Sequence, residues 1–302
     1  MPEKNRYPLV SIIVVTYNSS SYILETLESA KNQTYKKIEL IITDDCSTDN
    51  TVGICRNWLK TNKHRFINTN LITSLVNDGI GANCNRGLKV SKGEWLKFIA
   101  GDDILLNDCI QKFVKNSNLK KIIFGKIIYW DGLNERLGNR DSSFFLNEKL
   151  QYQMILKGTP LPAPASFINS QFLKDMGGFE IKYKLLEDIP LWLKMAKGGE
   201  IFYCLDEFVV KYRIHEQNLS IASTFYINPT FYKDYRKLVL NEILPELWRL
   251  RCYLWVLHFI NYIIVTDIIV KINNKQNKIN NILSFFVIRK LISKIINLFI
   301  VK

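Results

Sequence analysis

Short apolar runs alternate with amphipathic segments along the first half of the chain. Residues 9–15 (LVSIIVV) are rich in β-branched side chains, which is typical of a strand buried on both faces of a parallel sheet. Residues 21–32 then place apolar or small side chains at the spacing of an amphipathic helix. The alternation predicts further strands at 39–43, 71–76, 95–99 and 121–130, and helices at 82–91 and 105–115. It also predicts a helix through Ile54 and Trp58, with Asp49 as its N-cap. Such an order predicts an α/β fold with a doubly wound sheet.

Three polar loops follow predicted strands: Thr16–Ser20, Asp44–Asp49 and Ala100–Asp103. Ligands of doubly wound sheets bind outside the carboxyl ends of the strands, so these loops form the expected binding edge. Asp102 and Asp103 follow a buried run, where adjacent carboxylates repel each other unless a cation or hydrogen-bond donors offset the repulsion. Their hard oxygen atoms suit Mg²⁺ or Mn²⁺. For the Asp pair that opens the second loop, a turn or helix-cap role is an equal alternative.

Three further polar motifs are each open to a structural or a functional interpretation. Glycines at 79, 81 and 87 follow Asn77 and would let the backbone approach a ligand closely, although this spacing is also ordinary turn chemistry. Glu187 and Asp188 head a predicted helix, where a carboxylate either caps the helix or acts as a general base. Arg213 and His215 follow a strand-like run, in a polar stretch that suits contact with a phosphate.

The charge of the chain changes the picture at its C-terminal end. The net charge is +13 over 302 residues, which indicates an anionic partner such as anionic lipid, a phosphorylated substrate or nucleic acid. No acidic residue follows Asp267, whereas seven basic residues do: Lys271, Lys275, Lys278, Arg289, Lys290, Lys294 and Lys302. Residues 226–302 therefore form a separate basic, apolar tail.

Two segments of the tail favour a lipid surface. Residues 252–266 are uncharged but fall short of the roughly 20 residues that span a bilayer, so we expect a buried or interfacial helix there. Residues 287–299 place basic and polar side chains on one helical face and apolar ones on the other, as in helices that lie in an anionic headgroup plane. The alternative is a helix that packs on the catalytic domain. Nucleic acid is disfavoured because the basic residues are not interleaved with aromatics on a sheet.

Six cysteines are scattered, at 46, 55, 84, 109, 204 and 252, with no C-x-x-C pair. This arrangement argues against a zinc site or a redox motif and favours a reducing compartment. Residues 1–6 are polar and lack the apolar core of a signal peptide, so we expect the protein on the cytoplasmic side of the membrane.

Taken together, these motifs resemble the family 2 glycosyltransferases, which have the GT-A fold. The resemblance covers roughly residues 8–220, in order and spacing. Its stretches are VSIIVVTYN (10–18), ELIITDDCSTDNT (39–51), NDGIGANCNRGLKVSKGEW (77–95), FIAGDD (98–103), MGGFE (176–180), LLEDIPLWLKMA (185–196) and YRIHEQNLS (212–220). It implies a catalytic domain over 1–225, with a nucleotide-sugar half at about 8–125 and an acceptor half at about 126–225, followed by the amphipathic helical tail at 226–302.

The resemblance also implies a role for each matching residue. Thr16, Tyr17 and Asp45 would line the nucleobase pocket, Asn77 would add to donor binding, and Asp102 would meet the ribose. The roles nearer the reaction fall to residues of the later motifs: Asp103 as ligand of the divalent metal, Asp188 as catalytic base, and Arg213 with His215 closing over the diphosphate.

One departure concerns position 100. Many relatives carry a further Asp there, and this chain has Ala100, which bears on the affinity for the metal and on the preferred ion.

The activity implied is that of an inverting, metal-dependent hexosyltransferase using Mn²⁺ or Mg²⁺. By analogy, the donor would be a UDP-sugar, with glucose or galactose favoured, and the acceptor an undecaprenyl-diphosphate-linked sugar. A β-1,3 linkage to GlcNAc or GalNAc in O-antigen or capsule assembly extends this analogy, at the cytoplasmic face of the bacterial inner membrane. The alternatives are a nucleotidyltransferase, which would more usually have a Gly- and Lys-bearing loop after the first strand, and a non-catalytic membrane-bound nucleotide-binding module.

Overall fold

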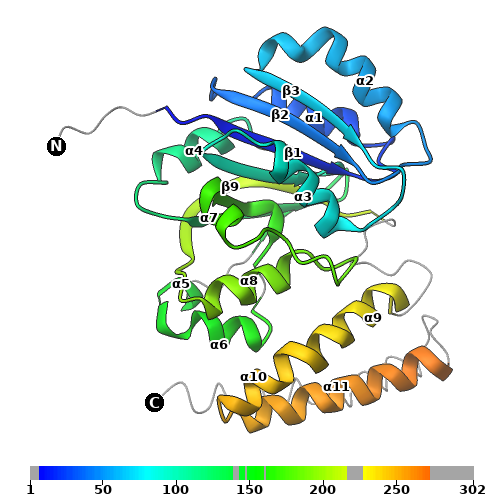
Figure 1. The fold of residues 1–302 in the computed structure, drawn as a ribbon, viewed down its shortest axis with the longest axis vertical. Helices are drawn as coiled ribbons and strands as arrows, with labels where there is room; N and C mark the ends of the chain where they lie inside the picture. The colour runs from blue at the N-terminus through cyan, green and yellow to red at the C-terminus, as the bar shows by residue number, and fades with distance from the viewer. Residues whose placement is uncertain (1–6, 139–142, 147, 160, 216–226, 273–302) are drawn as a thin grey trace. The chain divides into compact units, whose positions relative to one another are not determined.

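The computed structural model describes residues 7–138, 143–146, 148–159, 161–215 and 227–272 (Figure 1). The chain divides into two compact units, one of residues 1–155 with 159–214 and one of residues 156–158 with 215–302. The amphipathic segment predicted at 287–299 lies outside the described residues, as does the end of the last motif, 216–220. The boundary predicted at residue 225 falls in the same undescribed stretch.

Four parallel strands form the first half of the sheet in unit one, in the order β3-β2-β1-β4. Their bounds are β1 (Val10–Thr16), β2 (Ile38–Asp44), β3 (Asn68–Thr73) and β4 (Trp95–Ala100). Every residue of β2 is buried, as its continuous apolar run predicts for a central parallel strand. The register pairs Val15 with both Thr43 and Ala100, so the three loops selected from the sequence start at one edge of the sheet.

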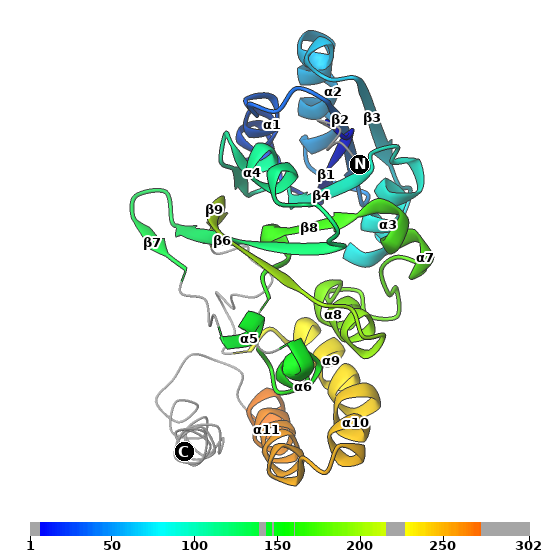
Figure 2. The same cartoon turned by 90° about the vertical axis from the view of Figure 1, so that its left-hand side faces the viewer.

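The alternating side chains of β1 meet different helices. The helices are α1 (Ile23–Lys31), α2 (Thr51–Asn62), α3 (Ile80–Val90) and α4 (Cys109–Lys115). Ile12 belongs to a core shared with residues of α1, α2 and α4. Ile13 points to the opposite face, where it lies against Gly87 of α3. Figure 2 shows α1 and α3 on opposite sides of these strands. This two-sided coverage confirms the predicted doubly wound arrangement for these strands.

Beyond β4 the sheet becomes mixed, which the sequence pattern did not indicate. The remaining strands are β5 (Ile104–Leu105), β6 (Ile122–Trp130), β7 (Glu135–Leu137), β8 (Ser166–Asn169) and β9 (Tyr203–Arg213). The order continues β4-β8-β6-β9-β5, with β7 beside β6. β8 runs antiparallel to both neighbours, and β9 pairs in parallel with β6 and antiparallel with β5. Four residues are too few for the periodicity of β8 to be recognised.

Two predicted boundaries were wrong for physical reasons. The strand expected at 71–76 is β3 at Asn68–Thr73, because polar Asn68 and Asn70 pair with β2 at a half-exposed edge of the sheet. The helix expected from residue 105 begins only at Cys109, because Leu105 pairs with Val210 of β9. Pairing with a strand a hundred residues away leaves no local signal in the sequence.

Short helices complete unit one. They are α5 (Ser143–Leu146), α6 (Gln151–Leu156), α7 (Ser170–Asp175) and α8 (Asp188–Lys197), with 3₁₀ turns at Lys63–Arg65, Glu148–Leu150 and Ala163–Ala165. α7 begins with a side-chain cap, since Asn169 accepts a hydrogen bond from the N–H of Phe172 at 3.0 Å.

Helix α3 lies flush against the backbone of the segment that leads into α8. Gly79 has φ +95°, and a Cβ there would come within 2.6 Å of the Lys184 carbonyl oxygen. A Cβ on Gly81 would come within 2.5 Å of the Glu180 carbonyl oxygen. The N–H of Ile80 donates to the Lys184 carbonyl at 2.9 Å. The glycine motif that the sequence left open thus has a structural role, because only glycine permits this approach of two backbones.

Asn85 of α3 makes a second connection to the same segment. Its amide nitrogen donates to the Phe179 carbonyl at 2.8 Å, and its amide oxygen accepts from the Phe179 N–H at 2.9 Å. Both hydrogen-bonding groups of one backbone residue are therefore satisfied by one side chain. The Phe179 ring also packs edge-on against Phe98 of β4, with ring centroids 4.9 Å apart. We call residues 178–184 the docked segment.

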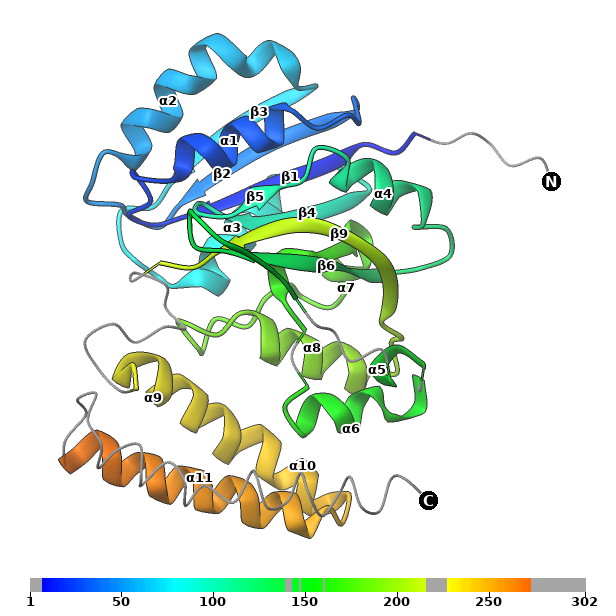
Figure 3. The same cartoon turned by 180° about the vertical axis from the view of Figure 1, so that it is seen from behind.

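The second unit is a helical hairpin in its described part (Figure 3). It contains α9 (Pro229–Leu238), a π-helical turn at Val239–Ile243, α10 (Leu244–Arg249) and α11 (Tyr253–Ile272). The helix predicted at 252–266 is longer than its uncharged stretch, because Asp267 pairs with Arg236 of α9 at 3.1 Å and the helix continues past it. In the described part, Tyr253–Lys271 is the one segment whose length and hydropathy would suffice to cross a membrane.

We predict that Asn85→Ala loosens the docked segment while the sheet stays intact. Each lost hydrogen bond contributes about 1 kcal/mol, so amide hydrogen exchange over residues 178–184 should accelerate about tenfold or more. Exchange in β2 should stay unchanged. Asn57→Ala, at an exposed position of α2, is the matched control. Unchanged exchange in the docked segment of the Asn85 variant would show that Asn85 does not hold it.

Candidate functional site

The loops after β1 and β2 are joined to each other by side-chain hydrogen bonds. The Asn18 amide oxygen accepts from the Thr48 N–H at 2.8 Å, and the Ser47 hydroxyl accepts from the Asn18 N–H at 2.8 Å. Asp49 accepts from the N–H groups of Ser20 and Thr51, each at 3.0 Å. Asp49 thus binds the first N–H of α2, although the residue that directly precedes the helix is Asn50, one position after the predicted N-cap. These bonds tie the two loops to each other.

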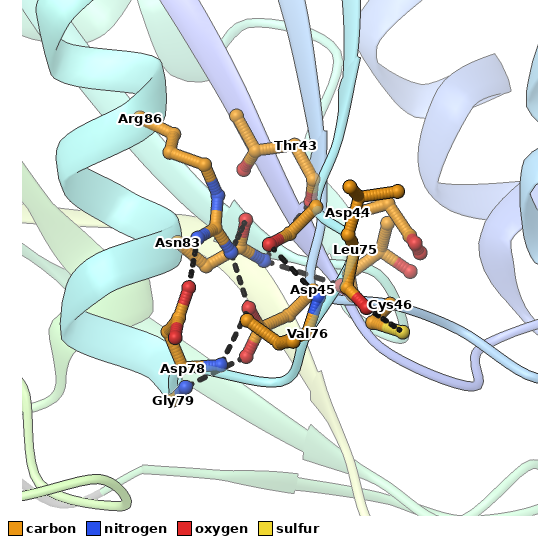
Figure 4. A network of polar contacts seen from close by, with 12 residues as sticks. Thr43, Asp44, Asp45, Cys46, Leu75, Val76, Asp78, Gly79, Asn83 and Arg86 are labelled. Atoms are coloured by element: carbon orange, nitrogen blue, oxygen red, sulfur yellow. Dashed lines mark hydrogen bonds and ion pairs between the residues drawn. The ribbon is translucent and has the colours of Figure 1, made fainter.

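The two adjacent acids after β2 have different roles. Asp44 is buried and accepts hydrogen bonds from the backbone N–H of Ser47, at 2.9 Å, and from its hydroxyl. The Asp44 carboxylate thus closes its own loop by binding the backbone three residues on, so the turn-device interpretation holds for Asp44. Asp45 is also buried, but its carboxylate points toward α3, where it binds groups of a different loop (Figure 4).

The Asp45 carboxylate organises the N-terminal end of α3. One oxygen accepts from the N–H of Gly79 at 2.8 Å, and the other accepts from the N–H of Asp78 at 3.2 Å and from Arg86 (Figure 4). Arg86 also contacts the Asp78 carboxylate at 3.1 Å. Charge-assisted bonds of this type are about twice as strong as neutral ones, so this carboxylate determines how the loop before α3 is placed.

Arg86 is a site residue that sequence reasoning missed. Its Nε–H is buried and has no acceptor among the described residues. The neighbouring Asn83 donates to the carbonyls of Thr16 and Thr43, at 3.2 and 3.0 Å, and so ties α3 to the ends of β1 and β2. The only sequence signal was an arginine inside a glycine-containing helix, which ordinarily indicates a solvated face.

The other residues predicted for donor binding differ in exposure. Thr16 is buried and its hydroxyl has no hydrogen-bond partner among the described residues. Tyr17 is 48% exposed directly after β1, and Asn77 is exposed before α3. The structure thus brings Thr16 and Asp45 together at one edge through the β1–β2 pairing, where the Asp45 N–H donates to the Thr16 carbonyl at 3.0 Å.

The second acidic pair lies at the end of β4. Asp103 is 1% exposed, and one of its carboxylate oxygens accepts from the Arg213 N–H at 2.9 Å. The other oxygen is buried without a hydrogen-bond donor in the described part of the chain. Burial, followed by the negative charge of Asp102, raises the pKa of the Asp103 carboxyl well above its ordinary value. Asp102 itself is partly exposed.

Arg213, at the end of β9, binds this turn. Its Nε donates to the Asp102 carbonyl at 2.8 Å, and a terminal nitrogen contacts Glu25 of α1 at 2.9 Å. The guanidinium lies over the rings of Trp130 and Tyr22, at 4.3 and 4.8 Å from their centroids. These contacts account for its 7% exposure. The guanidinium is therefore committed to supporting the acidic turn, and its predicted contact with a diphosphate stays a prediction.

His215 follows two residues later, where the second unit begins. It is partly exposed and is the last residue described before position 227. Its predicted contact with the diphosphate likewise stays a prediction.

Glu187 and Asp188 stand at the N-terminal end of α8, just after the docked segment. Loss of solvent raises the pKa of Asp188 to about 6. Loss of solvent and then the charge of Asp188 raise the pKa of Glu187 to about 8. Glu187 makes no side-chain capping bond to the helix, so capping does not explain this carboxyl. Near neutral pH the pair shares about one proton, which leaves one carboxylate as a base.

The donor set fits a divalent cation of the kind that GT-A enzymes commonly use. No group of three or more His, Cys, Asp or Glu side chains comes together within the described ranges. Mg²⁺ is typically held by one or two carboxylates, with the remaining ligands supplied by substrate phosphates and water. Adjacent Asp102 and Asp103, with a buried carboxylate oxygen that lacks a partner, fit that mode. All six cysteines are free thiols in the structure.

Comparison with known proteins places the chain in a family. The UDP-Glc:alpha-D-GlcNAc-diphosphoundecaprenol beta-1,3-glucosyltransferase WfaP of Escherichia coli is 29% identical over 212 residues, which cover 70% of this chain and 80% of that protein. The structure of S. aureus TarS 1-349 in complex with UDP-GlcNAc aligns with a TM-score of 0.60 and 24% identity, over 77% of this chain and 66% of that one. The Pyrobaculum calidifontis mannosyltransferase PcManGT, in complex with GDP-Man and Mn2+, aligns with a TM-score of 0.55 and 18% identity, over 72% of this chain and 60% of that one.

The two structural likenesses show the fold and confirm the predicted α/β GT-A architecture. The glycosyl transferase family 2 pattern matches residues 11–176, which is more than half of the chain. That range contains both acidic turns and the whole of α3, while Asp188 and Arg213 lie beyond it. The chain therefore belongs to glycosyl transferase family 2 and is a glycosyltransferase.

Proposed function

We propose that this protein is an inverting hexosyltransferase that moves glucose or galactose from a UDP-sugar to an undecaprenyl-diphosphate-linked sugar. The observation that carries the proposal is the Asp188 carboxyl, whose pKa is raised to about 6 and which lies just after the segment docked against α3, the helix that Asp45 holds. A base with a pKa just below neutral is ionised in the cell yet still basic enough to accept a proton.

The donor would bind at the carboxyl edge of β1, β2 and β4. Thr16, Tyr17 and Asp45 line the proposed nucleobase pocket, where Arg86 adds an unsatisfied N–H donor. Asn77 and Asp102 contribute further polar groups to donor binding. UDP is favoured because WfaP is named for UDP-Glc and TarS was solved with UDP-GlcNAc.

Asp103 and its neighbour Asp102 would hold Mn²⁺ or Mg²⁺. When bound, the ion supplies positive charge against the charge that develops on the leaving diphosphate. Ala100 removes one carboxylate that many relatives have, so this chain offers fewer negative ligands at that turn. Arg213 would keep both carboxylates in place through its bonds to the backbone of Asp102 and the side chain of Asp103. With His215, it is also proposed to lie near the diphosphate.

Asp188 would take the proton of the acceptor hydroxyl as that oxygen forms a bond to the anomeric carbon and the nucleoside diphosphate departs. Such a base contributes roughly 10²–10⁴-fold to the rate. A single displacement inverts the anomeric centre and leaves no covalent sugar on the protein. Protonated Glu187 beside it would carry no charge, so the repulsion between the two carboxyls is relieved.

The acceptor and cellular role rest on WfaP, whose name specifies a diphosphoundecaprenol-linked GlcNAc and a β-1,3 linkage. We propose an acceptor of this class, with GlcNAc or GalNAc at the reducing end, in O-antigen or capsule assembly. The enzyme would then work as a peripheral protein at the cytoplasmic face of the bacterial inner membrane.

The direct test is transfer with a panel of UDP-hexoses and a diphosphoundecaprenol-linked GlcNAc acceptor in Mn²⁺ or Mg²⁺. Absence of transfer and of UDP binding would refute the proposal.

Asp188→Asn should abolish transfer and leave donor binding nearly intact. The amide keeps the shape of the side chain and can still accept from the Ile189 N–H, yet it cannot take a proton. We expect kcat to fall by about 10²-fold or more, while the Kd for UDP measured by calorimetry stays within about threefold. A variant that loses UDP binding would place Asp188 in donor binding instead.

Asp103→Ala should remove the dependence of UDP binding on Mn²⁺. Asp103→Asn separates charge from structure, because the amide oxygen can still accept from the Arg213 N–H. Both variants should bind UDP equally with and without Mn²⁺, whereas Asp206→Ala, at an exposed carboxylate, should behave as the wild type. Stimulation by Mn²⁺ that persists in both Asp103 variants would assign the metal to other ligands.

The pH dependence of transfer should report the Asp188 carboxyl. A base must be deprotonated, so kcat should be maximal above the pKa of about 6 and fall about tenfold per pH unit well below it. UDP affinity measured at each pH separates this limb from loss of donor binding. A rate that stays constant from pH 7 to pH 5 would contradict Asp188 as the base.

A further inference from the structure

Helix α11 presents an apolar row to its surroundings. All the exposed positions from 253 to 268 are apolar or aromatic: Tyr253, Leu254, Leu257, Ile260, Ile264 and Ile268. They recur every three or four residues, so they follow one side of the helix for about four turns. Leu257 is 59% exposed and Ile264 is 54% exposed. A helix side that meets water is ordinarily polar, and a contiguous apolar side of this length marks an interaction surface.

The opposite side of α11 packs within the hairpin. Phe259 and Ile263 are buried there, and the Tyr232 hydroxyl of α9 donates to the Ile263 carbonyl at 3.1 Å. The same hydroxyl contacts Asp267 at 2.9 Å, and Arg236 contacts Asp267 at 3.1 Å. Figures 1 and 3 show α11 running alongside α9 and α10. The helix therefore already has a protein partner on one side, whereas most of its outer row has none within the described residues.

The ends of the row carry the residue types of a lipid–water interface. Trp248 is 64% exposed and packs edge-on against Tyr253, with centroids 5.3 Å apart. Exposed Arg251 precedes the row and exposed Lys271 follows it. Aromatic rings and long basic side chains favour the headgroup region, where the stems stay apolar and the tips reach water or lipid phosphate.

The position of Asp267 distinguishes a helix in the membrane plane from one that spans it. Length and hydropathy alone would permit a span. A span would carry Asp267 into the hydrocarbon, either with Arg236 or without it, and both arrangements are costly. In-plane insertion of the outer row leaves the Asp267–Arg236 pair inside the hairpin, on the side away from the lipid.

The charge of the chain favours anionic lipid, rather than a second copy of the protein, as the partner of the apolar row. The net charge is +13, and every ionisable side chain after Asp267 is basic. Two such tails would repel each other across a dimer interface, whereas a bilayer rich in anionic lipid attracts them.

We propose that α11 lies in the plane of an anionic bilayer, with the row from Tyr253 to Ile268 inserted among the lipids and Arg251 and Lys271 at the headgroups. This inference extends the proposed function and rests on it. A helix inserted in the bilayer would hold the enzyme at the surface that contains a lipid-linked acceptor. The partner is recognised by apolar area and negative charge together, as for other interfacial helices.

The test is flotation of the full-length protein with vesicles of phosphatidylglycerol and phosphatidylethanolamine, compared with vesicles of phosphatidylcholine alone. The wild type should float with the anionic vesicles. L257E/I264E should reduce the bound fraction at least tenfold, since two charges would enter the apolar layer. L75E/L119E, at the exposed leucines of unit one, is the matched control and should bind as the wild type does. The milder L254S/I268S should give an intermediate loss, and thermal melting should match the wild type.

Four outcomes would overturn the proposal. The wild type could fail to float with anionic vesicles, or L257E/I264E could float as well as the wild type. Protein bound to the vesicles could resist extraction by alkaline carbonate, which would indicate a span. Light scattering without vesicles could show a wild-type dimer that L257E/I264E abolishes, which would assign the row to a second copy. UDP calorimetry on the same preparations keeps the two proposals apart, because a wild type that floats but binds no UDP refutes only the proposed function.

Discussion

The buried carboxylate of Asp45 is the interaction on which the catalytic unit depends. It accepts two backbone N–H groups at the start of α3 and the guanidinium of Arg86 within that helix. A carboxylate is costly to bury without hydrogen-bond donors, whereas burial is favourable when donors satisfy its oxygens. The groups that donate to Asp45 therefore have little freedom to move. Because Asp45 follows β2 directly, the position of α3 is determined by the central strands of the sheet.

Helix α3 transmits that constraint to the proposed catalytic base. Its glycines admit the backbone of the docked segment, and Asn85 satisfies both backbone groups of Phe179. The docked segment leads within a few residues to Asp188 at the start of α8. A misplacement of about 1 Å at a reacting group can lower the rate about 10²-fold. Polar contacts that run from the carboxyl edge of the sheet toward Asp188 would therefore keep the proposed base in position.

A second constraint comes from the opposite end of the sheet. The last residue of β9 donates its backbone N–H to Asp103, and its side chain binds the Asp102 carbonyl and Glu25. Three elements far apart in the sequence thus converge on one acidic turn. The guanidinium of Arg213 holds the like charges of that turn in place on one side, and one oxygen of Asp103 stays buried without a donor among the described residues.

The second unit depends on different interactions from those of the catalytic unit. Its described helices pack as a hairpin that contains the partly exposed Asp267–Arg236 ion pair, and its exposed apolar row, apart from Tyr253 against Trp248, has no partner among the described residues. Soluble domains rarely leave such a row open to water. The uneven charge of the chain and the in-plane geometry of α11 give this row a physical purpose that the catalytic unit does not require.

Local patterns in the sequence determined the four parallel strands, the helices that cover them and the acidic turns, because buried strands and amphipathic helices have periods that can be read within ten residues. The roles within those turns depended on the tertiary structure. Sequence alone could not tell Asp44, which closes its own turn, from Asp45, which organises α3, because both are adjacent acids after a strand. Arg86, β8 and the glycine contacts with the docked segment were decided by partners up to a hundred residues away, and pairing over such distances leaves no periodic trace in the chain. The length of α11 was likewise decided by the tertiary pairing of Asp267 with Arg236, which neutralises a charge that ends the apolar run in the sequence.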